Sequence, residues 1–434
     1  MTDYVKFLRD TSPYINTHRG KTFVLALGGE AVAHANFTNI VHDIALLHSL
    51  GIKLILVHGA RQQVEERLKN CAIPAQFNQN IRITDSATMA CVKDAVGSTR
   101  INIEAQLSTG AANSPMHGAR IQVVGGNMIT AKPLGVREGI DFHHTGEVRR
   151  VDKKGIQKQL DDGAIVLLSP IGYSPTGEAF NLNYEDIATQ AAVSLNAEKL
   201  IIFSAQEGVS DSTGDLLKMI SLKEVPRRLD DLSSNVTLQH ALMACYQACE
   251  NGVSRGHIIS YVDNGALLGE LFSREGRGTL VLQNGHEVIR QATIDDVGGL
   301  LDIIAPLEEQ GVLVKRSREL LETEISRFSV MLHAEGMLIG CAALYPFSAG
   351  NAAELACVAT HTDFLNQGIA RRLLEHIEGQ AAQQGIKHLF VLTIQAGHWF
   401  KEHGFVDATL DDLPEERQSL YNLQRNSQIY RKNL

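Results

Sequence analysis

The sequence predicts two α/β domains: an N-terminal sandwich built on a mostly parallel sheet, and a smaller C-terminal domain with a mixed sheet. The first observation is length, because 434 residues are too many for one hydrophobic core. The second is that short apolar runs alternate with amphipathic helices from Lys21 onward, which is typical of a parallel sheet covered on both faces. The third is a change of pattern at residues 283–289, where Asn284-Gly285 signals a turn.

Composition favours a soluble, cytoplasmic protein. Hydrophobic residues make up 44% of the chain and charged residues 21%, and no apolar run is long enough to cross a bilayer. The N-terminal stretch MTDYVKFLRDTSPY carries acidic residues and a broken apolar pattern, unlike a secretory signal. The net charge of -9 argues against a nucleic-acid partner.

The six cysteines are scattered along the chain, which is typical of a reduced cytosolic protein. Cys245 and Cys249 lie in an Ala-rich helical stretch without a second pair, so we interpret them as core residues rather than metal ligands. No metal-binding constellation stands out, and we predict no metal.

Residues 1–20 are predicted to form a separate amphipathic helix with one apolar edge at Tyr4, Phe7 and Leu8. Ser12-Pro13 is predicted to end it, because proline cannot donate the backbone hydrogen bond. Such a helix either docks on another subunit or folds onto its own domain, and the sequence leaves both readings open.

Residues 21–285 form the predicted N-terminal domain. Ligands of parallel α/β sheets bind beyond the carboxyl ends of the strands, where Gly28-Gly29, His58-Gly59 and Gly125-Gly126 fall. The predicted strands are 22–27, 53–57, 120–124, 164–168 and 200–203, and the predicted helices include 39–50 and 61–69.

Residues 287–434 form the predicted C-terminal domain. Thr293 and Asp296 have the spacing of a helix-opening capping box. The turn at 366–370 precedes an amphipathic helix, whose N-terminal amides can hold phosphate. The remaining predicted elements are strands 288–292, 328–333, 337–345, 353–360 and 388–393, a helix at 316–327 and an aromatic helix closed by Gly404-Phe405.

Five segments of the N-terminal domain resemble the amino-acid kinase family, and within it the N-acetylglutamate kinases: ALGGE (26–30), VHGAR (57–61), NIRIT (80–84), FNLNYEDIA (180–188) and AEKLIIF (197–203). The chain departs from that family at Ala26, where the kinases have lysine, and also at Ala60 and Glu185. A kinase needs this cation to offset charge on the transferred phosphoryl group. The resemblance therefore implies a kinase scaffold that has lost its chemistry.

The same resemblance implies a regulatory role for residues 21–285. Lys199, His257, Glu270 and Gly276 follow the order and spacing of the arginine-binding residues in arginine-inhibited family members. A carboxylate suits a guanidinium ligand, because the hydrogen bonds are charge-assisted. The stretch SPYINTHRGKTFV resembles the mobile helix region that interlaces those kinases into hexamers, so a homo-hexamer is implied.

The C-terminal domain resembles the GCN5-related N-acetyltransferases at residues 354–405. The resemblance implies that backbone amides near Cys357 and Ala359 hold the thioester of acetyl-CoA. It also implies that the turn binds the pyrophosphate, although Leu365 replaces the family's Arg or Gln. The implied pyrophosphate-binding residues are Gln367, Gly368, Ala370, Arg371 and Arg372.

Three residues of this domain are candidates for proton transfer or for positioning a water. Glu354 is the candidate base, because an amine must lose a proton before it attacks a thioester. Thr393 stands at a family Asn position and is a candidate to hold a water or the pantetheine arm. Phe400 replaces a family Tyr that protonates the leaving thiolate, which leaves His398 as a further candidate acid.

Four segments together resemble the family of bacterial N-acetylglutamate synthases: GVLVKRSRELLE (311–322), ELACVA (354–359), LTIQAGHWFKEHGF (392–405) and LYNLQRNS (420–427). The resemblance implies acetyl transfer to L-glutamate, with feedback inhibition by L-arginine. It also implies a substrate site made of Arg316, Arg425, Ser427 and the backbone at Val314. Two alternatives remain: a working N-acetylglutamate kinase with an appended acetyltransferase, and an arginine-sensing protein with an inactive transferase.

Overall fold

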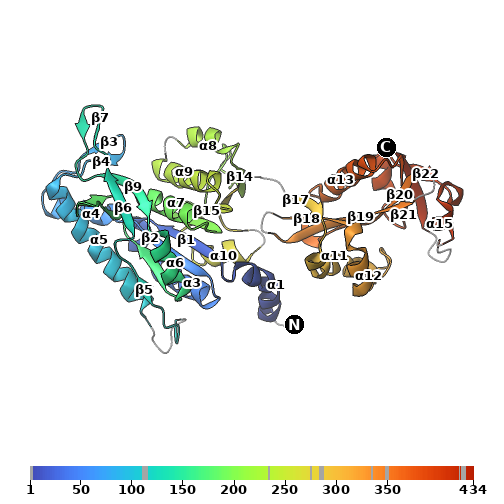
Figure 1. The fold of residues 1–434 in the computed structure, drawn as a ribbon, viewed down its shortest axis with the longest axis horizontal. Coiled ribbons are helices and arrows are strands. Elements are labelled where there is room, and N and C mark those ends of the chain that lie inside the picture. The colour runs from blue at the N-terminus through green and yellow to red at the C-terminus, as the bar shows by residue number, and fades with distance from the viewer. Residues whose placement is uncertain are drawn as a thin grey trace. The chain divides into compact units, whose positions relative to one another are not determined.

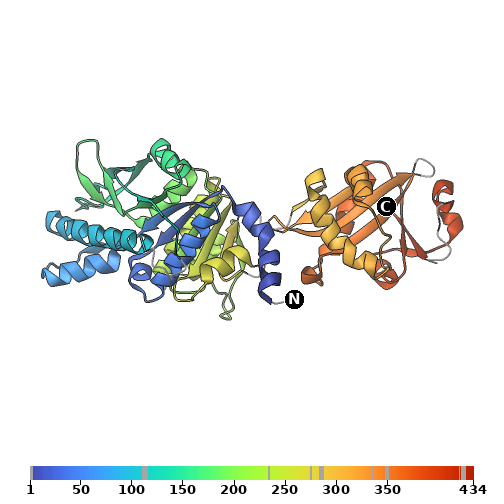
Figure 2. The same ribbon diagram turned by 90° about the horizontal axis from the view of Figure 1, so that it is seen from below.

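The computed structural model describes residues 3–109, 116–232, 235–273, 276–282, 288–333, 336–347, 351–419, 421 and 427–434. The chain divides into two compact units, Met1–Gly285 and His286–Leu434, each built around its own sheet (Figures 1 and 2). No helix in these described ranges has the length and apolarity needed to span a lipid bilayer.

The first unit is built on an eight-stranded sheet in the order β14-β16-β15-β13-β1-β2-β10-β5. Neighbouring strands are parallel except for the antiparallel pair β15 and β16, which confirms the predicted mostly parallel sheet. The strands are β1 Thr22–Leu27, β2 Lys53–His58, β5 Val123–Val124, β10 Ile165–Leu168, β13 Lys199–Ser204, β14 Met219–Ser221, β15 Arg255–Ser260 and β16 Thr279–Leu282.

Helices cover both faces of this sheet, as Figure 1 shows. One face packs on α6 Lys153–Asp161, α7 Tyr184–Ser194 and α9 Val236–Glu250. The other packs on α3 Phe37–Ser49, α5 Ser86–Leu107 and α10 Ala266–Phe272. The remaining helices of the unit are α2 Gly29–Ala33, α4 Arg61–Asn70 and α8 Val225–Asp231.

A second, four-stranded sheet in the order β12-β11-β6-β9 was not predicted. Its strands are short or carry polar residues, so they lack the apolar runs that marked the main sheet. They are β6 Ile129–Pro133, β9 Gly146–Val151, β11 Ile171–Tyr173 and β12 Ala179–Asn181. Two hairpins complete the unit: β3 Phe77–Asn78 with β4 Ile81–Arg82, and β7 Val136–Arg137 with β8 Ile140–Asp141.

Helix α1 runs over Asp3–His18, so the prediction that Pro13 ends it is wrong. Residues that follow Pro13 in the sequence make tertiary contacts, and these contacts stabilise the last turn of α1. Tyr14 is buried in the core beneath the sheet, and the buried His18 ring lies 3.0 Å from the carbonyl oxygen of Leu271 in α10. This end of the helix therefore folds onto its own unit. The side chains of Tyr4, Phe7 and Leu8 lie outside the described part of the chain.

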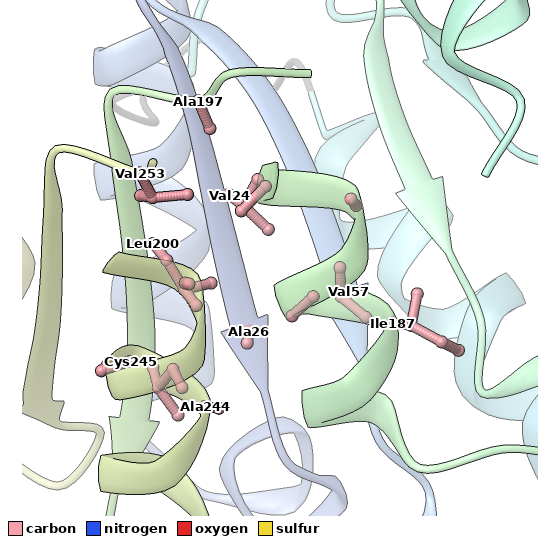
Figure 3. Packing of buried hydrophobic residues seen from close by; sticks show 14 of the residues in the cluster. Val24, Ala26, Val57, Ile187, Ala197, Leu200, Ala244, Cys245 and Val253 are labelled. Carbon is pink, nitrogen blue, oxygen red and sulfur yellow. The ribbon is translucent and has the colours of Figure 1, made fainter. Parts of the chain in front are cut away.

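Ala26 occupies a fully buried position on β1. Its side chain lies with Val24 and Val57 in a cluster that also contains Ile187 of α7 and Cys245 of α9 (Figure 3). Phe23, Leu25 and Leu27 alternate with these residues and face the opposite core. Where the kinases carry lysine, this chain therefore packs a methyl group in a hydrophobic core.

The second unit is a seven-stranded sheet in the order β17-β18-β19-β20-β21-β23-β22. Only β20 and β21 are parallel neighbours, so the predicted mixed sheet is confirmed. The strands are β17 Val288–Gln291, β18 Phe328–Leu332, β19 Leu338–Phe347, β20 Ala352–Thr360, β21 His388–Thr393, β22 Val406–Ala408 and β23 Gln428–Asn433.

Two helices sandwich this sheet. Helix α13 (Ile369–Gln383) buries Ile369, Leu373, Leu374 and Ile377 against one face, at the predicted helical spacing. Helix α11 (Val297–Glu309) packs on the other face and follows the predicted capping box of Thr293 and Asp296. The shorter helices are α12 Arg318–Glu324, α14 Gly397–Glu402 and α15 Glu415–Gln418.

His58 makes the stability of the first unit sensitive to acid. Burial lowers the pKa of its ring to about 4, against an ordinary value near 6.5. Since the unfolded chain binds the proton first, stability is present above pH 6.5 and is lost as the pH falls toward 4. We expect wild type to lose about 2 kcal/mol more than His58→Gln between pH 7 and pH 5, measured by urea unfolding.

The comparison with the variant isolates His58 from other buried groups. Burial raises the pKa of Asp43 to about 6 and that of Glu185 to about 7, and these carboxyl groups stabilise the fold as the pH falls. His398→Gln, which changes an exposed ring in the second unit, serves as the matched control. An equal acid loss in wild type and His58→Gln would contradict the assignment.

Candidate active site

The sheet of the second unit opens between β20 and β21. Their parallel ladder joins Ala352–Glu354 to His388–Phe390. Beyond it, β20 stays paired with β19 as far as Thr360, and β21 stays paired with β23 as far as Thr393. The two strands therefore diverge after Glu354.

A β-bulge redirects β20 where the strands part. From Cys341 to Ala343 on β19, the partner on β20 shifts from Ala359 to Ala356, so β20 carries one extra residue. Cys357 lies in this bulge with a φ of +52°, an uncommon value for a residue with a side chain. Backbone amides at such a bulge are released from the ladder and can polarise a carbonyl oxygen.

A cavity of about 570 Å³ lies between the diverging strands. Apolar side chains form much of its wall, including Leu313, Val391, Trp399 and Phe400. A mostly apolar cavity with a few polar groups is typical of a small-molecule site. The predicted site residues that line it are Val314, Arg316, Glu354, Cys357, Ala370, Thr393 and Ser427.

Glu354 is ion-paired inside this cavity. Arg417 of α15 donates through Nε and Nη2 to the two carboxylate oxygens of Glu354, at 2.5 and 3.2 Å. Both side chains are largely buried, which strengthens a bidentate pair. Arg417 was not predicted, because a single arginine within a short acidic helix carries no sequence signal of its own.

A network of side chains surrounds Arg316. Its backbone N–H donates to Glu308 at 2.9 Å, and its Nη1 donates to the Val314 carbonyl at 3.0 Å. Burial opposes the charge of Arg316, but nearby Cys357 and Tyr345 favour it, and its pKa lies above the ordinary value. The Tyr345 hydroxyl in turn donates to Glu324 at 2.7 Å. The guanidinium is thus held at the cavity wall as a fixed cation.

Thr393, Phe400 and His398 differ in their access to the cavity. The Thr393 hydroxyl lines it and accepts the backbone N–H groups of Gln395 and Ala396 at 3.3 and 3.0 Å. Phe400 also lines it, but its ring carries no proton to donate. His398 is exposed at the start of α14 and is not part of the cavity wall.

The predicted pyrophosphate loop enters α13 with an exposed backbone. Gln367 and Gly368 are exposed, and Gly368 is the N-cap residue with a φ of +73°, which glycine adopts without strain. Arg371 pairs with Glu375 at 2.9 Å on the helix surface. Leu365 is 55% exposed where an Arg or Gln was expected, so the features here that can attract an anion are the positive end of the helix and the arginines.

Other predicted residues lie around the cavity or outside the described part of the chain. Ala359 is buried beside Cys357 in the core that α11 covers. Ser427 accepts the Tyr421 hydroxyl through its carbonyl at 2.8 Å. Arg425 lies outside the described residues. In the ranges that the structure describes, no group of three or more His, Cys, Asp or Glu side chains is placed to hold a metal ion.

The predicted arginine-binding residues of the first unit form one buried chain of polar groups. Lys199 Nζ lies 3.3 Å from His257 Nε2, and His257 Nδ1 lies 2.7 Å from Glu270 Oε1. The exposed fractions of these three residues are 0%, 1% and 6%. The pKa of Glu270 is lowered, because hydrogen bonds from His257 and from the N–H groups of Arg277 and Gly278 outweigh burial.

Gly276 completes this group. It has a φ of +62°, and a Cβ atom on it would lie 2.9 Å from Glu270 Oε2. The close approach and the left-handed backbone both require glycine. The four residues named from the family resemblance therefore lie together: His257 and Gly276 adjoin the Glu270 carboxylate, and Lys199 adjoins His257.

A further cavity, of about 410 Å³, lies at the predicted ligand edge of the first unit. Its wall includes Ala60, Arg61, Tyr184 and Glu185. Ala26 is absent from that wall, because its side chain is packed in the core described above.

Comparison with known proteins agrees with both units. Residues 21–260 match the amino acid kinase family, and residues 300–405 match the acetyltransferase (GNAT) family. Curated amino-acid acetyltransferases of Pseudomonas fluorescens (strain Pf0-1) and Ectopseudomonas mendocina (strain ymp) are 55% and 54% identical over 434 residues, with 100% of both chains covered.

Two crystal structures of N-acetylglutamate synthase from Neisseria gonorrhoeae are also similar. The complex with coenzyme A and L-arginine has a TM-score of 0.89 at 35% identity. The complex with coenzyme A and N-acetyl-glutamate has a TM-score of 0.63 at 36% identity. Each alignment covers 100% of this chain and 99% of the other. The chain therefore belongs to the bacterial amino-acid acetyltransferases of the N-acetylglutamate synthase family, enzymes that join an amino acid kinase domain to a GNAT domain and use acetyl-CoA as co-substrate.

Proposed function

We propose that this enzyme transfers the acetyl group of acetyl-CoA to the α-amino group of L-glutamate, in the first step of arginine biosynthesis. The observation that carries the proposal is the cavity in which the Glu354 carboxylate and the Arg316 guanidinium both line the gap between β20 and β21. The Neisseria gonorrhoeae relative has been captured with coenzyme A and N-acetyl-glutamate, the expected product, which supports this choice of acceptor.

L-Glutamate fits the charges of the cavity. Its two carboxylates need fixed cations, and guanidinium groups bind carboxylates in a bidentate manner. Arg316 provides one cation: its guanidinium donates to the Val314 carbonyl, and its backbone is anchored to Glu308. Arg417 provides a second, and the predicted Arg425 would add another. Ser427 lies in the same wall and offers a hydroxyl to the acceptor.

Glu354 takes the proton from the α-amino group, directly or through a water. The Arg417 pair holds this carboxylate in place before the acceptor arrives. An incoming carboxylate of L-glutamate then competes for Arg417, which frees Glu354 to act as a base. The base becomes available when the correct acceptor is bound.

The amine nitrogen then forms a bond to the thioester carbon, and the carbon–sulfur bond breaks. Backbone amides at the bulge near Cys357 stabilise the oxygen anion of the tetrahedral intermediate. The proton removed from the amine returns to the coenzyme A thiolate. Phe400 cannot deliver it, whereas the Thr393 hydroxyl accepts two backbone amides and keeps its own hydrogen available to donate or to orient a water.

The N-terminus of α13 holds the pyrophosphate of acetyl-CoA in this proposal. The exposed backbone at Gln367 and Gly368 approaches the anion, and Ala370 connects the loop to the cavity. Arg371 and Arg372 add positive charge at the same end of the helix. The adenine-bearing part of the cofactor thus lies at the helix and its thioester lies at the bulge.

L-Arginine inhibits the enzyme by binding at Lys199, His257, Glu270 and Gly276. The Glu270 carboxylate, with a lowered pKa, is charged and complements a guanidinium. The Neisseria gonorrhoeae relative has also been captured with L-arginine. We place this reaction in the cytoplasm and expect a homo-hexamer in which α1 contributes to subunit contacts. A kinase activity is not favoured, because Ala26 is packed in the core.

Replacing the base tests the chemistry. Glu354→Gln removes the proton acceptor and also breaks the ion pair with Arg417, so we expect kcat to fall by about 10²- to 10⁴-fold. The measurement is glutamate-dependent release of thiol from acetyl-CoA. Glu378→Gln is the matched control, since it removes an ion-paired carboxylate on α13 outside the cavity wall. No glutamate-dependent thiol release by wild type would overturn the proposed function.

Replacing the substrate cation tests the choice of acceptor. Arg316→Gln removes a charge-assisted contact worth about 1.5–3 kcal/mol, so we expect the KM for L-glutamate to rise about 10- to 100-fold. The KM for acetyl-CoA should change little. Arg318→Gln, on the exposed surface of α12, is the control. An unchanged KM for L-glutamate would place the acceptor elsewhere.

Replacing the buried carboxylate tests the inhibitor site. Glu270→Gln removes the charge that complements the guanidinium of L-arginine, so the half-inhibitory concentration should rise at least about tenfold. Each variant is compared with its own rate without L-arginine, and binding is measured separately by calorimetry. Glu250→Gln removes an exposed carboxylate of α9 as the control. Wild-type sensitivity in Glu270→Gln would contradict the site.

A further inference from the structure

Two thiols lie together at the bulge that opens the cavity. The chain has six cysteines, all in described ranges, and Cys341 and Cys357 belong to one buried cluster on the face covered by α11. The Cys341 thiol donates to the Cys357 carbonyl, with Sγ and O 3.5 Å apart. Cys357 lines the cavity wall, whereas Cys341 is 0% exposed behind it.

The bulge at Cys357 decides which face of the sheet its side chain takes. Leu355 faces the core beneath α13, but Cys357 faces the opposite core, because the bulge between them changes the face of the strand. The acetyl-transfer chemistry uses the backbone at this position and leaves the sulfur without a role. A residue that carries a nucleophilic thiol thus lines a ligand-sized cavity.

Nearby groups favour the thiolate form of Cys357. The neighbouring Cys341 thiol lowers the pKa of the Cys357 thiol, and the Arg316 guanidinium adds to this effect against the opposing effect of burial. By contrast, burial raises the pKa of the Cys245 and Cys249 thiols. Thiolates are the nucleophilic form of cysteine, so these surroundings favour reaction at Cys357 over Cys245 and Cys249.

We propose that Cys357 is a site of oxidative modification by hydrogen peroxide, with Cys341 as the resolving thiol that converts the product to a disulfide. The Cys357 thiolate attacks one peroxide oxygen, the O–O bond breaks, and a sulfenic acid and hydroxide form. The Cys341 sulfur then attacks the Cys357 sulfur, the S–O bond breaks, and the Cys341 proton leaves in water. Two thiols are oxidised, and one peroxide is reduced to two waters.

The disulfide would link β19 to β20 at the bulge, where the backbone amides polarise the thioester in the proposed reaction. Acetyl transfer is therefore expected to stop until the disulfide is reduced. This consequence rests on the function proposed above, whereas the oxidation does not. Acetyl-CoA, which occupies the same cavity in that proposal, should protect Cys357 from peroxide.

The test exposes the full-length chain to hydrogen peroxide, blocks free thiols with iodoacetamide and maps every cysteine by mass spectrometry. We expect a peptide pair joined between Cys341 and Cys357 with the loss of two hydrogen atoms, formed at least about tenfold faster than any oxidation of Cys245. Dithiothreitol should reverse it. In Cys341→Ala, dimedone should trap the sulfenic acid on Cys357, and Cys249→Ala should behave as wild type.

Exposed Cys71 serves as the internal reference for general oxidation. If Cys341 and Cys357 stay reduced while Cys71 is oxidised, the proposal is wrong, and this result needs no variant to fold. Oxidation of Cys357 without protection by acetyl-CoA would support the modification site and count against the proposed position of the cofactor. Protection without any linked peptide pair would count against Cys341 as the resolving thiol.

Discussion

The chemistry of this enzyme depends on the separation of two parallel strands. β20 and β21 share a ladder over Ala352–Glu354 and His388–Phe390 and then diverge, while each keeps its outer partner. The sheet stays continuous, so opening it breaks only hydrogen bonds between the two central strands. The released backbone groups face a cavity, where a thioester can satisfy them. The bulge at Cys357 lies where the strands part.

The Glu354 carboxylate and the Arg417 guanidinium form a charge pair beside this opening. Glu354 is held by Arg417, the Arg316 guanidinium donates to the Val314 carbonyl, and the Arg316 backbone N–H donates to Glu308. Buried cations remain tolerable only while they are paired. In the proposed reaction, a carboxylate of the acceptor replaces Glu354 on Arg417, so the cation stays paired while Glu354 is released. The same network reaches Cys357, whose thiol is close to Arg316.

The first unit has the fold of the amino acid kinase family but differs from the kinases at a buried position of β1. Ala26 fills a hydrophobic cluster where a kinase needs a cation (Figure 3). Lys199 lies on β13 and His257 on the neighbouring strand β15, two residues farther along the ladder. Lys199 contacts His257, and His257 contacts Glu270. A buried chain of polar groups is stable only when every member has partners, and these three side chains provide partners for one another.

Sequence alone determined the elements whose signal is local. The apolar runs at 22–27 and 388–393 gave strands with the predicted bounds, and Thr293 with Asp296 formed the predicted capping box. Family resemblance identified both domains and the co-substrate. The tertiary structure decided the rest. Helix α1 continues past Pro13 because Tyr14 and His18 pack on distant residues, and Glu354 pairs with Arg417 across 63 positions. Such contacts leave no periodic pattern in the sequence from which they could be predicted, because they depend on which surfaces the fold brings together.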